Sequence, residues 1–509
     1  MIESSDSFRF EKTFPGSSTC ILVGRVPEGM PSLVASCRAV LWIVDAAGVG
    51  RPPGRLPTGA LSLLLVEQCA EEQLEKAINE FILKSSKHLP SLYVTRQIPP
   101  EQDARFATAI GCVYACVESH HRDRVTRQRS AFAWQSHLFE NSRAYMTRRL
   151  PDLWRGALAG APAFVCGAGP SFDVSARELA RVSHRGVVLA ADSSLKALAR
   201  LGVPADFAVS VDVAKTPAKC LPETLVPARV VLAATSPPQW SEAVPAARRV
   251  YVSNNQLTLD WFASQGVSRT EVAVCENCGA TALELARFLG CSPIYLFGMD
   301  LALNPDGPVR RHHELVDPAI YANSGFNARQ QFPRVPGNFA AEVPTHVIGD
   351  WRALDRRIAG WPRGLVSVVT DRGARLRNTT VVRPEQFLLP SGELNKEQRL
   401  SVLSEPLAPP AESCRGVLEK LTRFGSYLVQ WAPSLRRALE TGGPDRLVDN
   451  LRTLFADPEN GRMLGAYSLK LMPDLLPPIP EDAALWRLAI GDLENLGRHA
   501  LHGAATRPS

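Results

Sequence analysis

Short apolar runs alternate with amphipathic stretches through the middle of the chain. The apolar runs resemble strands that are covered on both faces, and they lie at residues 163–166, 187–191, 207–211, 229–234, 250–253 and 294–297. Stretches with helical periodicity lie between or after them, at residues 175–182, 194–201, 257–265 and 280–289. This alternation predicts a mostly parallel, Rossmann-like α/β sheet with helices on both faces. Ligands of such sheets bind beyond the carboxyl ends of the strands, so functional residues are expected there.

The amino-terminal part of the chain shows the same pattern on a smaller scale. Apolar runs occupy residues 20–23, 40–44 and 61–66, and the clearest helix-compatible stretch is residues 71–84. These elements predict a small α/β domain. Its residues form no pattern that indicates catalysis or ligand binding.

After about residue 385 the strand pattern stops. Leucines then recur at helical spacing, for example at Leu421, Leu428 and Leu451. Such leucines fit a helix-on-helix core better than an interaction surface, so we predict a helical carboxyl-terminal domain. The predicted domain boundaries are residues 1–124, 125–385 and 386–509.

Composition and charge agree with a folded chain of several domains. The 509 residues are 45% hydrophobic and 21% charged, which lies within the globular range. The net charge of +6 comes from scattered arginines rather than basic runs, which disfavours a nucleic-acid partner. No secretory signal and no apolar run of roughly 20 residues is visible, so we expect a cytoplasmic protein without a membrane span.

The cysteines do not indicate a metal site. The eleven cysteines lie mostly in apolar, strand-like stretches, where free cysteine behaves as a small hydrophobe. Cys275 and Cys278 form the one close pair with zinc-like spacing, and they lack a second pair or matched histidines. The sequence therefore predicts no bound metal at this pair.

A glycine turn follows the first strand of the central domain and precedes a helix. It runs from Gly167 to Ser171 and reads Gly-Ala-Gly-Pro-Ser. The free amides of Gly169 and Ser171, together with the Ser171 hydroxyl, could donate hydrogen bonds to phosphate oxygens; an ordinary strand-to-helix turn is the alternative. A dinucleotide fingerprint would need a third glycine where Phe172 stands. The turn thus favours a nucleotide phosphate over NAD.

Carboxylates follow three of the predicted strands. Asp192, Asp212 and Asp300 each stand at a carboxyl end, where an acid can accept hydrogen bonds from ribose or sugar hydroxyls. Each could instead cap the helix that follows. No Asp-x-Asp pair follows a strand of this domain, so a divalent metal clamp on donor phosphates is not indicated.

A second turn and three histidines complete the candidate chemistry. Asn277 and Gly279 lie between a strand candidate and a helix, where they either contact a nucleobase or cap the helix. His312 and His313 follow Asp300 in a polar loop, and His346 comes later. Histidine titrates near neutrality and is the usual base for a sugar hydroxyl, although a solvated loop histidine is the alternative for each.

Several ordered motifs resemble the motility-associated-factor (Maf) glycosyltransferase family. The central domain of that family is similar to bacterial sialyltransferases and to archaeal 6-hydroxymethylpterin pyrophosphokinases. The resemblance covers about residues 125–382. It rests on the segments 167–171, 191–198, 204–212, 282–291, 298–301, 335–338, 343–345 and 369–376.

The resemblance implies transfer of a nonulosonic acid, such as pseudaminic or legionaminic acid, from a CMP donor to Ser or Thr of flagellin. Neither a metal nor another cofactor is implied. The implied donor-binding residues are Gly167, Gly169, Ser171, Asn277, Gly279 and Asn338, and the strand-end acids Asp192 and Asp212 join them.

The implied reaction is an inverting transfer with a histidine as base. His313 and His312 rank ahead of His346 for this role, and Asp300 is a further catalytic candidate. Arg310, Arg311 and Lys196 could hold the donor carboxylate and phosphate, because arginine suits planar anions.

The chain departs from the family pattern in two loops, and other functions stay open. Residues 339–342 read Phe-Ala-Ala-Glu where the family has a Gly-Gly pair, and residues 311–314 read Arg-His-His-Glu where it has a Thr-His-Ala-like element. Acceptor handling is therefore expected to differ. The alternatives are a 6-hydroxymethyl-dihydropterin pyrophosphokinase that uses ATP and magnesium, and a non-catalytic protein that binds flagellin.

Overall fold

The computed structural model describes residues 8–14, 16–25, 37–49, 60–84, 88–304, 312–314, 332–389, 396–403 and 411–505. The chain divides into two compact units. One comprises residues 1–129 with 472–478, and the other comprises residues 130–471 with 479–509. The glycine turn and the strand-end acids belong to the second unit, whereas Arg310 and Arg311 lie outside the described residues.

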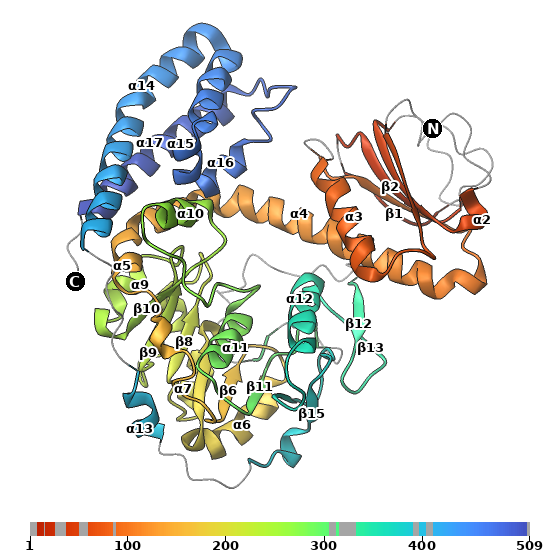
Figure 1. Ribbon diagram of the computed structural model, residues 1–509, viewed down its shortest axis with the longest axis vertical. Coiled ribbons are helices and arrows are strands. Elements are labelled where there is room, and N and C mark those ends of the chain that lie inside the picture. The colour runs from red at the N-terminus through yellow and green to blue at the C-terminus, as the bar shows by residue number, and fades with distance from the viewer. Residues whose placement is uncertain are drawn as a thin grey trace. The chain divides into compact units, whose positions relative to one another are not determined.

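The first unit contains a five-stranded sheet in the order β1-β5-β2-β3-β4 (Figure 1). Strands β2 to β5 pair in parallel, and β1 joins β5 in antiparallel fashion. This confirms the small α/β domain. Its elements are β1 (Phe8–Lys12), β2 (Thr19–Val23), β3 (Ala39–Val44), α2 (Ala46–Val49), β4 (Ala60–Leu65), α3 (Glu71–Lys84), β5 (Ser91–Thr95) and the start of α4 (Asp103–Glu140).

The second unit is built on an eight-stranded sheet in the order β10-β9-β8-β7-β6-β11-β14-β15, and all its pairings are parallel. Apart from the edge strand β15, the strands are almost wholly buried, as expected for a sheet covered on both faces. The six predicted strands are confirmed, and β14 and β15 are additional. The bounds are β6 (Ala163–Cys166), β7 (Val187–Ala191), β8 (Phe207–Ser210), β9 (Arg229–Ala233), β10 (Arg249–Val252), β11 (Ile294–Phe297), β14 (Val366–Val369) and β15 (Thr380–Val382).

Helices cover this sheet and confirm the predicted alternation. Apolar residues of α11, including Leu283 and Ala286, pack into the same core as Val165 and Leu189 of the strands. The helices of this part are α5 (Ser142–Thr147), α6 (Phe172–Val182), α7 (Leu195–Arg200), α8 (Pro217–Cys220), α9 (Gln239–Ala243), α10 (Leu257–Ser264), α11 (Cys278–Phe288) and α12 (Ile348–Ala359). A small hairpin, β12 (Arg334–Pro336) and β13 (Glu342–Pro344), precedes α12.

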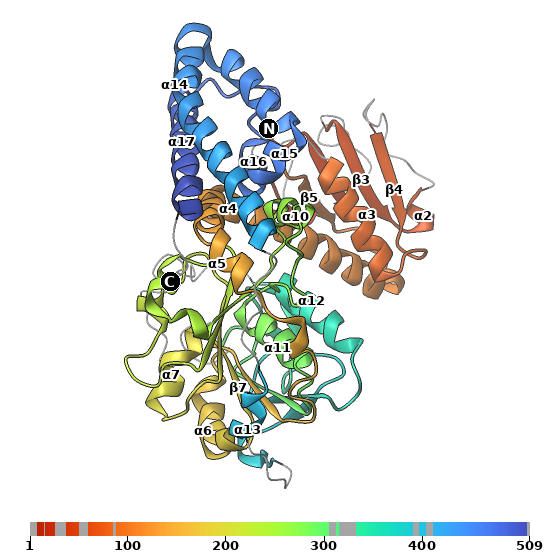
Figure 2. The same ribbon diagram turned by 60° about the vertical axis from the view of Figure 1, so that its left-hand side comes forward.

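The carboxyl-terminal region is helical, as predicted. Helices α14 (Ala411–Ala456) and α17 (Ala483–Ala505) run side by side (Figures 1 and 2). Leu421, Leu428 and Leu451 are buried, which confirms their role in a helix-on-helix core. The remaining helices are α13 (Lys396–Ser401), α15 (Pro458–Met463) and α16 (Gly465–Leu471). In the part of the chain that the structure describes, no helix has the length and apolarity to cross a membrane.

The strand order of the larger sheet positions the candidate site. From β6 the chain proceeds through β7, β8 and β9 to β10 on one side, then returns to place β11 on the other side of β6. The chain therefore reverses direction in the sheet between β6 and β11. Open parallel sheets bind their ligands at this switch point, beyond the carboxyl ends of the strands.

Candidate functional site

The glycine turn lies at the switch point, between β6 and α6, as predicted. It approaches the end of β11 so closely that side chains would not fit on its glycines. A Cβ on Gly167 would lie 2.5 Å from the Gly298 carbonyl oxygen and 2.7 Å from Sδ of Met299. A Cβ on Gly169 would overlap Oδ2 of Asp300. The two glycines are therefore required for the close packing of two strand ends.

The two amides expected to hold a phosphate have partners within the chain. The Gly169 amide donates to the Gly298 carbonyl over 2.7 Å, and the Ser171 amide donates to Oδ2 of Asp300 over 2.6 Å. The expectation that both are free is thus wrong for this structure. The physical reason is that the turn after β11 meets the turn after β6 directly. Nucleotide binding by the turn stays a prediction.

Asp300 is buried between the glycine turn and the loop that follows β14. Its side chain is 3% exposed. Burial raises the pKa of its carboxyl to about 6, although the Ser171 hydroxyl and amide act in the opposite direction. The Thr370 hydroxyl lies 3.4 Å from Oδ1. Asp300 therefore links the glycine turn to the loop after β14. Among the described residues, no hydrogen bond joins Asp300 to His312 or His313.

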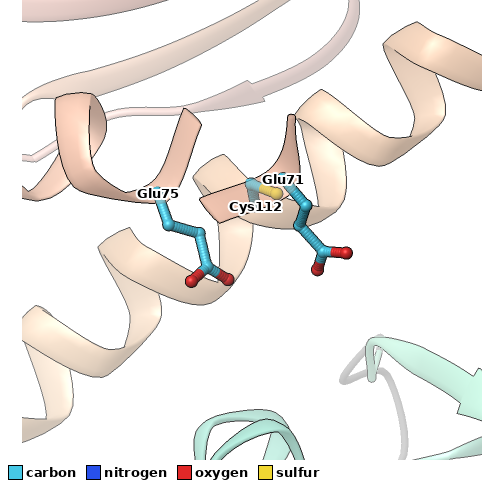
Figure 3. A group of neighbouring side chains, drawn as sticks. All are labelled: Glu71, Glu75 and Cys112. Atoms are coloured by element: carbon cyan, nitrogen blue, oxygen red, sulfur yellow. The ribbon is translucent and has the colours of Figure 1, made fainter. Parts of the chain in front are cut away.

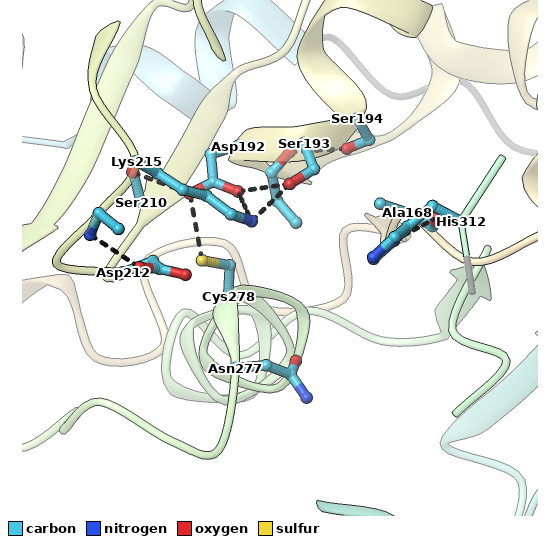
Figure 4. A network of polar contacts seen from close by, with 12 residues as sticks. Ala168, Asp192, Ser193, Ser194, Ser210, Asp212, Lys215, Asn277, Cys278 and His312 are labelled. Carbon is cyan, nitrogen blue, oxygen red and sulfur yellow. Dashed lines mark hydrogen bonds and ion pairs between the residues drawn. The ribbon is translucent and has the colours of Figure 1, made fainter. Parts of the chain in front are cut away.

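Asp192 lies at the centre of a buried polar network at the end of β7 (Figure 4). Its Oδ1 accepts from Nζ of Lys215 over 2.9 Å and from the Ser193 hydroxyl over 3.0 Å. Its Oδ2 accepts from the Ser210 hydroxyl over 2.9 Å and lies 3.4 Å from Sγ of Cys278. The carboxylate is thus occupied by contacts that join β7, β8 and α11. Its role in binding a sugar hydroxyl stays a prediction.

Lys215 is a residue of this region that sequence reasoning missed. Its side chain is 17% exposed, and its ammonium bridges Asp192 and Ser193. It follows Asp212 by three positions in the loop after β8, so its position near a strand end could have been predicted from the sequence. The fold brings a cation to the carboxyl edge of the sheet here. Lys196, the predicted cation, instead donates to the Ala218 carbonyl over 3.4 Å.

Asp212 differs from the other two acids because its side chain is exposed. Its Oδ1 accepts from the Ala214 amide over 2.8 Å, which closes a short turn after β8. Figure 4 shows Asp212 beside Cys278 and close to Asp192 and Lys215. Asp192 and Asp212 therefore lie close together, whereas Asp300 lies at the glycine turn.

The second turn serves the start of α11. Oδ1 of Asn277 accepts from the Ala280 amide over 2.9 Å, which is the capping alternative. The Asn277 side-chain amide donates to Asp350 over 3.2 Å. Gly279 is packed so tightly against Met299 that a Cβ would overlap the sulfur. Both residues therefore position α11, and a nucleobase contact stays a prediction.

The Cys275–Cys278 pair belongs to no group of three potential metal ligands among the described residues, and the expected absence of a metal there stays a prediction. Burial, with the nearby Asp192 carboxylate, holds the pKa of the Cys278 thiol well above its usual range. Among the described residues, the one group of three potential metal ligands is Glu71, Glu75 and Cys112 in the first unit (Figure 3). The two glutamates stand one helical turn apart on α3, a spacing that brings side chains together without an ion.

His313 is held against the glycine turn and is almost wholly buried. Its backbone amide donates to the Ala168 carbonyl over 3.1 Å. Its ring nitrogen Nε2 lies 3.3 Å from the Ser193 carbonyl, so Nε2 carries the hydrogen. Nδ1 is buried with no hydrogen-bond partner among the described residues. Burial lowers the pKa of this imidazole to about 4, so at neutral pH Nδ1 offers a lone pair.

The remaining predicted residues lie around this loop. Nδ1 of His312 lies 3.2 Å from the Ala168 carbonyl (Figure 4). His346 follows β13 and precedes α12. The Asn338 side-chain amide donates to the Arg372 carbonyl over 2.8 Å, and its backbone amide donates to Gly373 over 3.0 Å. Asn338 thus holds the hairpin loop against the loop that encloses Asp300.

Comparisons with known proteins bear on the central domain. Residues 136–306 match the family model described as 6-hydroxymethylpterin diphosphokinase MptE-like. A solved MAf glycosyltransferase from Magnetospirillum magneticum AMB-1 is similar over 95% of this chain and 78% of that chain, at 16% sequence identity and a TM-score of 0.49. No curated protein matches the chain. The residues that match the family model include the glycine turn and the three strand-end acids, so the similarity covers the candidate site.

Proposed function

We propose that the central domain is a nucleotide-dependent transferase whose donor binds at the carboxyl ends of β6, β7 and β11. The reaction that we favour is transfer of a nonulosonic acid from its CMP donor to Ser or Thr of flagellin or a similar protein. The observation that carries this proposal is the buried Nδ1 of His313, an acceptor beside the glycine turn that has no hydrogen-bond partner among the described residues.

His313 fits the role of the base in an inverting transfer. The acceptor hydroxyl attacks the anomeric carbon, the bond to the CMP oxygen breaks, and Nδ1 accepts the hydroxyl proton. The Ser193 carbonyl fixes the ring through Nε2 and stabilises the positive charge that forms on it. A low pKa makes the imidazole a weak base, but it also keeps the ring unprotonated at neutral pH.

Positive charge at the strand ends suits an anionic donor. Lys215 pairs with Asp192 beyond the end of β7, and its side chain is partly exposed. Lysine acts on phosphate and carboxylate groups as a point charge. Lys215 is therefore our candidate for the cation that meets the donor, in addition to the predicted Arg310 and Arg311.

A diphosphokinase is the second candidate, because the matching family model carries that description. The exposed carboxylate of Asp212 at the end of β8 could bind a magnesium ion that carries ATP, since magnesium sites often use one or two carboxylates with substrate phosphates. Titration calorimetry separates the two functions. We expect CMP to bind without added metal, whereas tight ATP binding that requires magnesium would support the kinase.

The role of His313 is tested by His313→Gln, which retains hydrogen-bonding groups but cannot act as a base at neutral pH. We expect turnover to fall about 10²- to 10⁴-fold with little change in CMP affinity. The measurement is the intact mass of the acceptor protein from cells that carry each variant. His184→Gln is the matched control, because His184 is exposed and precedes β7 at the opposite edge of the sheet. Full modification of the acceptor protein by His313→Gln would rule out His313 as the base. An unmodified acceptor with the His184→Gln control would also reject it, because the loss of activity would not be specific to His313.

A further inference from the structure

The turn between β6 and α6 already holds an anion that the chain itself supplies. The Ser171 amide donates to Oδ2 of Asp300 over 2.6 Å, although 129 positions separate the two residues. Helix α6 begins at the next residue, Phe172. The carboxylate therefore lies at the N-terminus of a helix, where the helix dipole favours negative charge. A phosphate bound by this turn would need the same position.

Glycine backbone packs closely against both carboxylate oxygens of Asp300. A Cβ on Gly169 would overlap Oδ2, and a Cβ on Gly373 would lie 2.9 Å from Oδ1. Gly373 has a φ of +85°, so its loop also needs glycine for its backbone conformation. The carboxylate is thus enclosed by backbone on both sides.

We propose that Asp300 is a positioning residue of the glycine turn and that a nucleotide phosphate binds there only in exchange for its carboxylate. This inference deepens the proposed function and rests on it. In the exchange, the Ser171 N–H leaves Oδ2 and donates to a phosphate oxygen. Asp300, now beside a second anion, takes up one proton from solvent.

The charges around Asp300 make this proton uptake favourable. Burial raises the pKa of the carboxyl to about 6, Asp371 acts in the same direction, and Arg372 and Ser171 oppose it. The carboxyl is ionised above pH 6 in the free protein, and a neighbouring phosphate raises its pKa further. Binding that takes up one proton weakens as the pH rises, by up to about tenfold per pH unit.

Titration calorimetry of the full chain with CMP between pH 5.5 and 8.5 tests this exchange. In the wild type we expect the affinity to fall with rising pH, and the binding heat to depend on the ionisation enthalpy of the buffer. Asp300→Asn removes the titrating group, so it should bind CMP at least about tenfold more tightly at pH 8. The phosphate of CMP titrates equally with both proteins, and the difference between them therefore reports on Asp300.

Asp206→Asn is the matched control. Asp206 is also a buried carboxyl with a raised pKa, and it accepts from the Val188 amide over 2.7 Å. It precedes β8, at the opposite edge of the sheet, and its variant should retain the wild-type pH dependence.

Two outcomes separate this inference from the proposed function. Equal affinity and equal pH dependence of Asp300→Asn and the wild type would overturn the exchange while leaving the nucleotide site in place. Failure of both CMP and ATP with magnesium to bind the wild type at any pH would reject the proposed function itself. If Asp300→Asn does not fold, the wild-type measurement still decides, because binding without proton uptake overturns the exchange.

Discussion

Burial acts in opposite directions on two titratable residues beside the glycine turn. It raises the pKa of Asp300 to about 6 and lowers that of His313 to about 4. In each case a low-dielectric environment disfavours the charged form. At neutral pH, however, Asp300 is still ionised and His313 is neutral. The site in its ligand-free state thus combines an internal anion with an uncharged acceptor.

His313 gives a prediction for acid stability. Its pKa is depressed from 6.5 in the unfolded chain to about 4, so its contribution to folding is present above pH 6.5 and is lost as the pH falls through about 4. The difference is about 3 kcal/mol. His313→Gln has no such titration, so its unfolding free energy should fall less between pH 6.5 and 4 than that of the wild type.

Urea denaturation at several pH values measures this difference. His184→Gln is again the control, because an exposed histidine should leave the acid sensitivity unchanged. Parallel pH curves for His313→Gln and the wild type would show that His313 is not buried as a neutral group in solution.

At the scale of elements, the ends of strands and helices decide the geometry of the site. The glycine turn, the loop after β11 and the start of α11 meet because Gly167, Gly169 and Gly279 leave no side chain between them. Met299 fills the space between Gly167 and Gly279. The glycines that looked like a phosphate cradle in the sequence therefore also act as packing residues.

Gly169→Ala tests this packing role. The new Cβ would overlap Oδ2 of Asp300 and lie 2.8 Å from the Gly298 carbonyl oxygen, so we expect a loss of about 1–3 kcal/mol in the free energy of unfolding. Gly491→Ala is the matched control. Gly491 lies within α17 with nothing within 4 Å of the new Cβ, so this change should add up to about 1 kcal/mol. If thermal unfolding showed that both variants change stability in the same direction relative to the wild type, the packing role of Gly169 would be contradicted.

At the scale of the whole molecule, the carboxyl-terminal helices belong to the same compact unit as the large sheet. Gln135 of α4 is a buried link between them. Its side-chain amide donates to the Met463 carbonyl over 2.8 Å, and its Oε1 accepts from the Ala466 amide over 3.1 Å. These contacts satisfy backbone groups at the junction of α15 and α16. A helical region that is separate in sequence is thus joined to the central domain by polar contacts.

Gln135→Ala should destabilise this unit by about 1–3 kcal/mol, because it leaves the buried Ala466 amide without its partner, whereas the Met463 carbonyl still accepts from the Thr258 hydroxyl. Urea denaturation measures the loss, and hydrogen exchange at the Ala466 amide should become faster. Gln239→Ala is the control, since Gln239 is exposed on α9 and its loss should change stability by less than about 0.5 kcal/mol. Unchanged exchange at Ala466 would show that Gln135 does not link the helices.

The sequence predicted more of the secondary-structure elements than of the side-chain contacts. Continuous apolar runs predicted β6 to β11 because strands covered on both faces need no polar positions. The short strand β15 (Thr380–Val382) was missed, since three partly exposed residues give no such run. For Asn277 the sequence allowed either a nucleobase contact or a helix cap, and only the tertiary structure shows that it caps α11. Lys215 was missed because its partner Asp192 is distant in sequence.

The sequence by itself determined the α/β class, the helical carboxyl-terminal region and the glycine turn after the first central strand, because each depends on local periodicity and backbone preference. Only the tertiary structure decided what fills that turn. Asp300 reaches Ser171 across 129 positions because β11 returns to lie beside β6. Strand order depends on how whole strands and helices pack, and buried strands with similar apolar composition do not encode it locally.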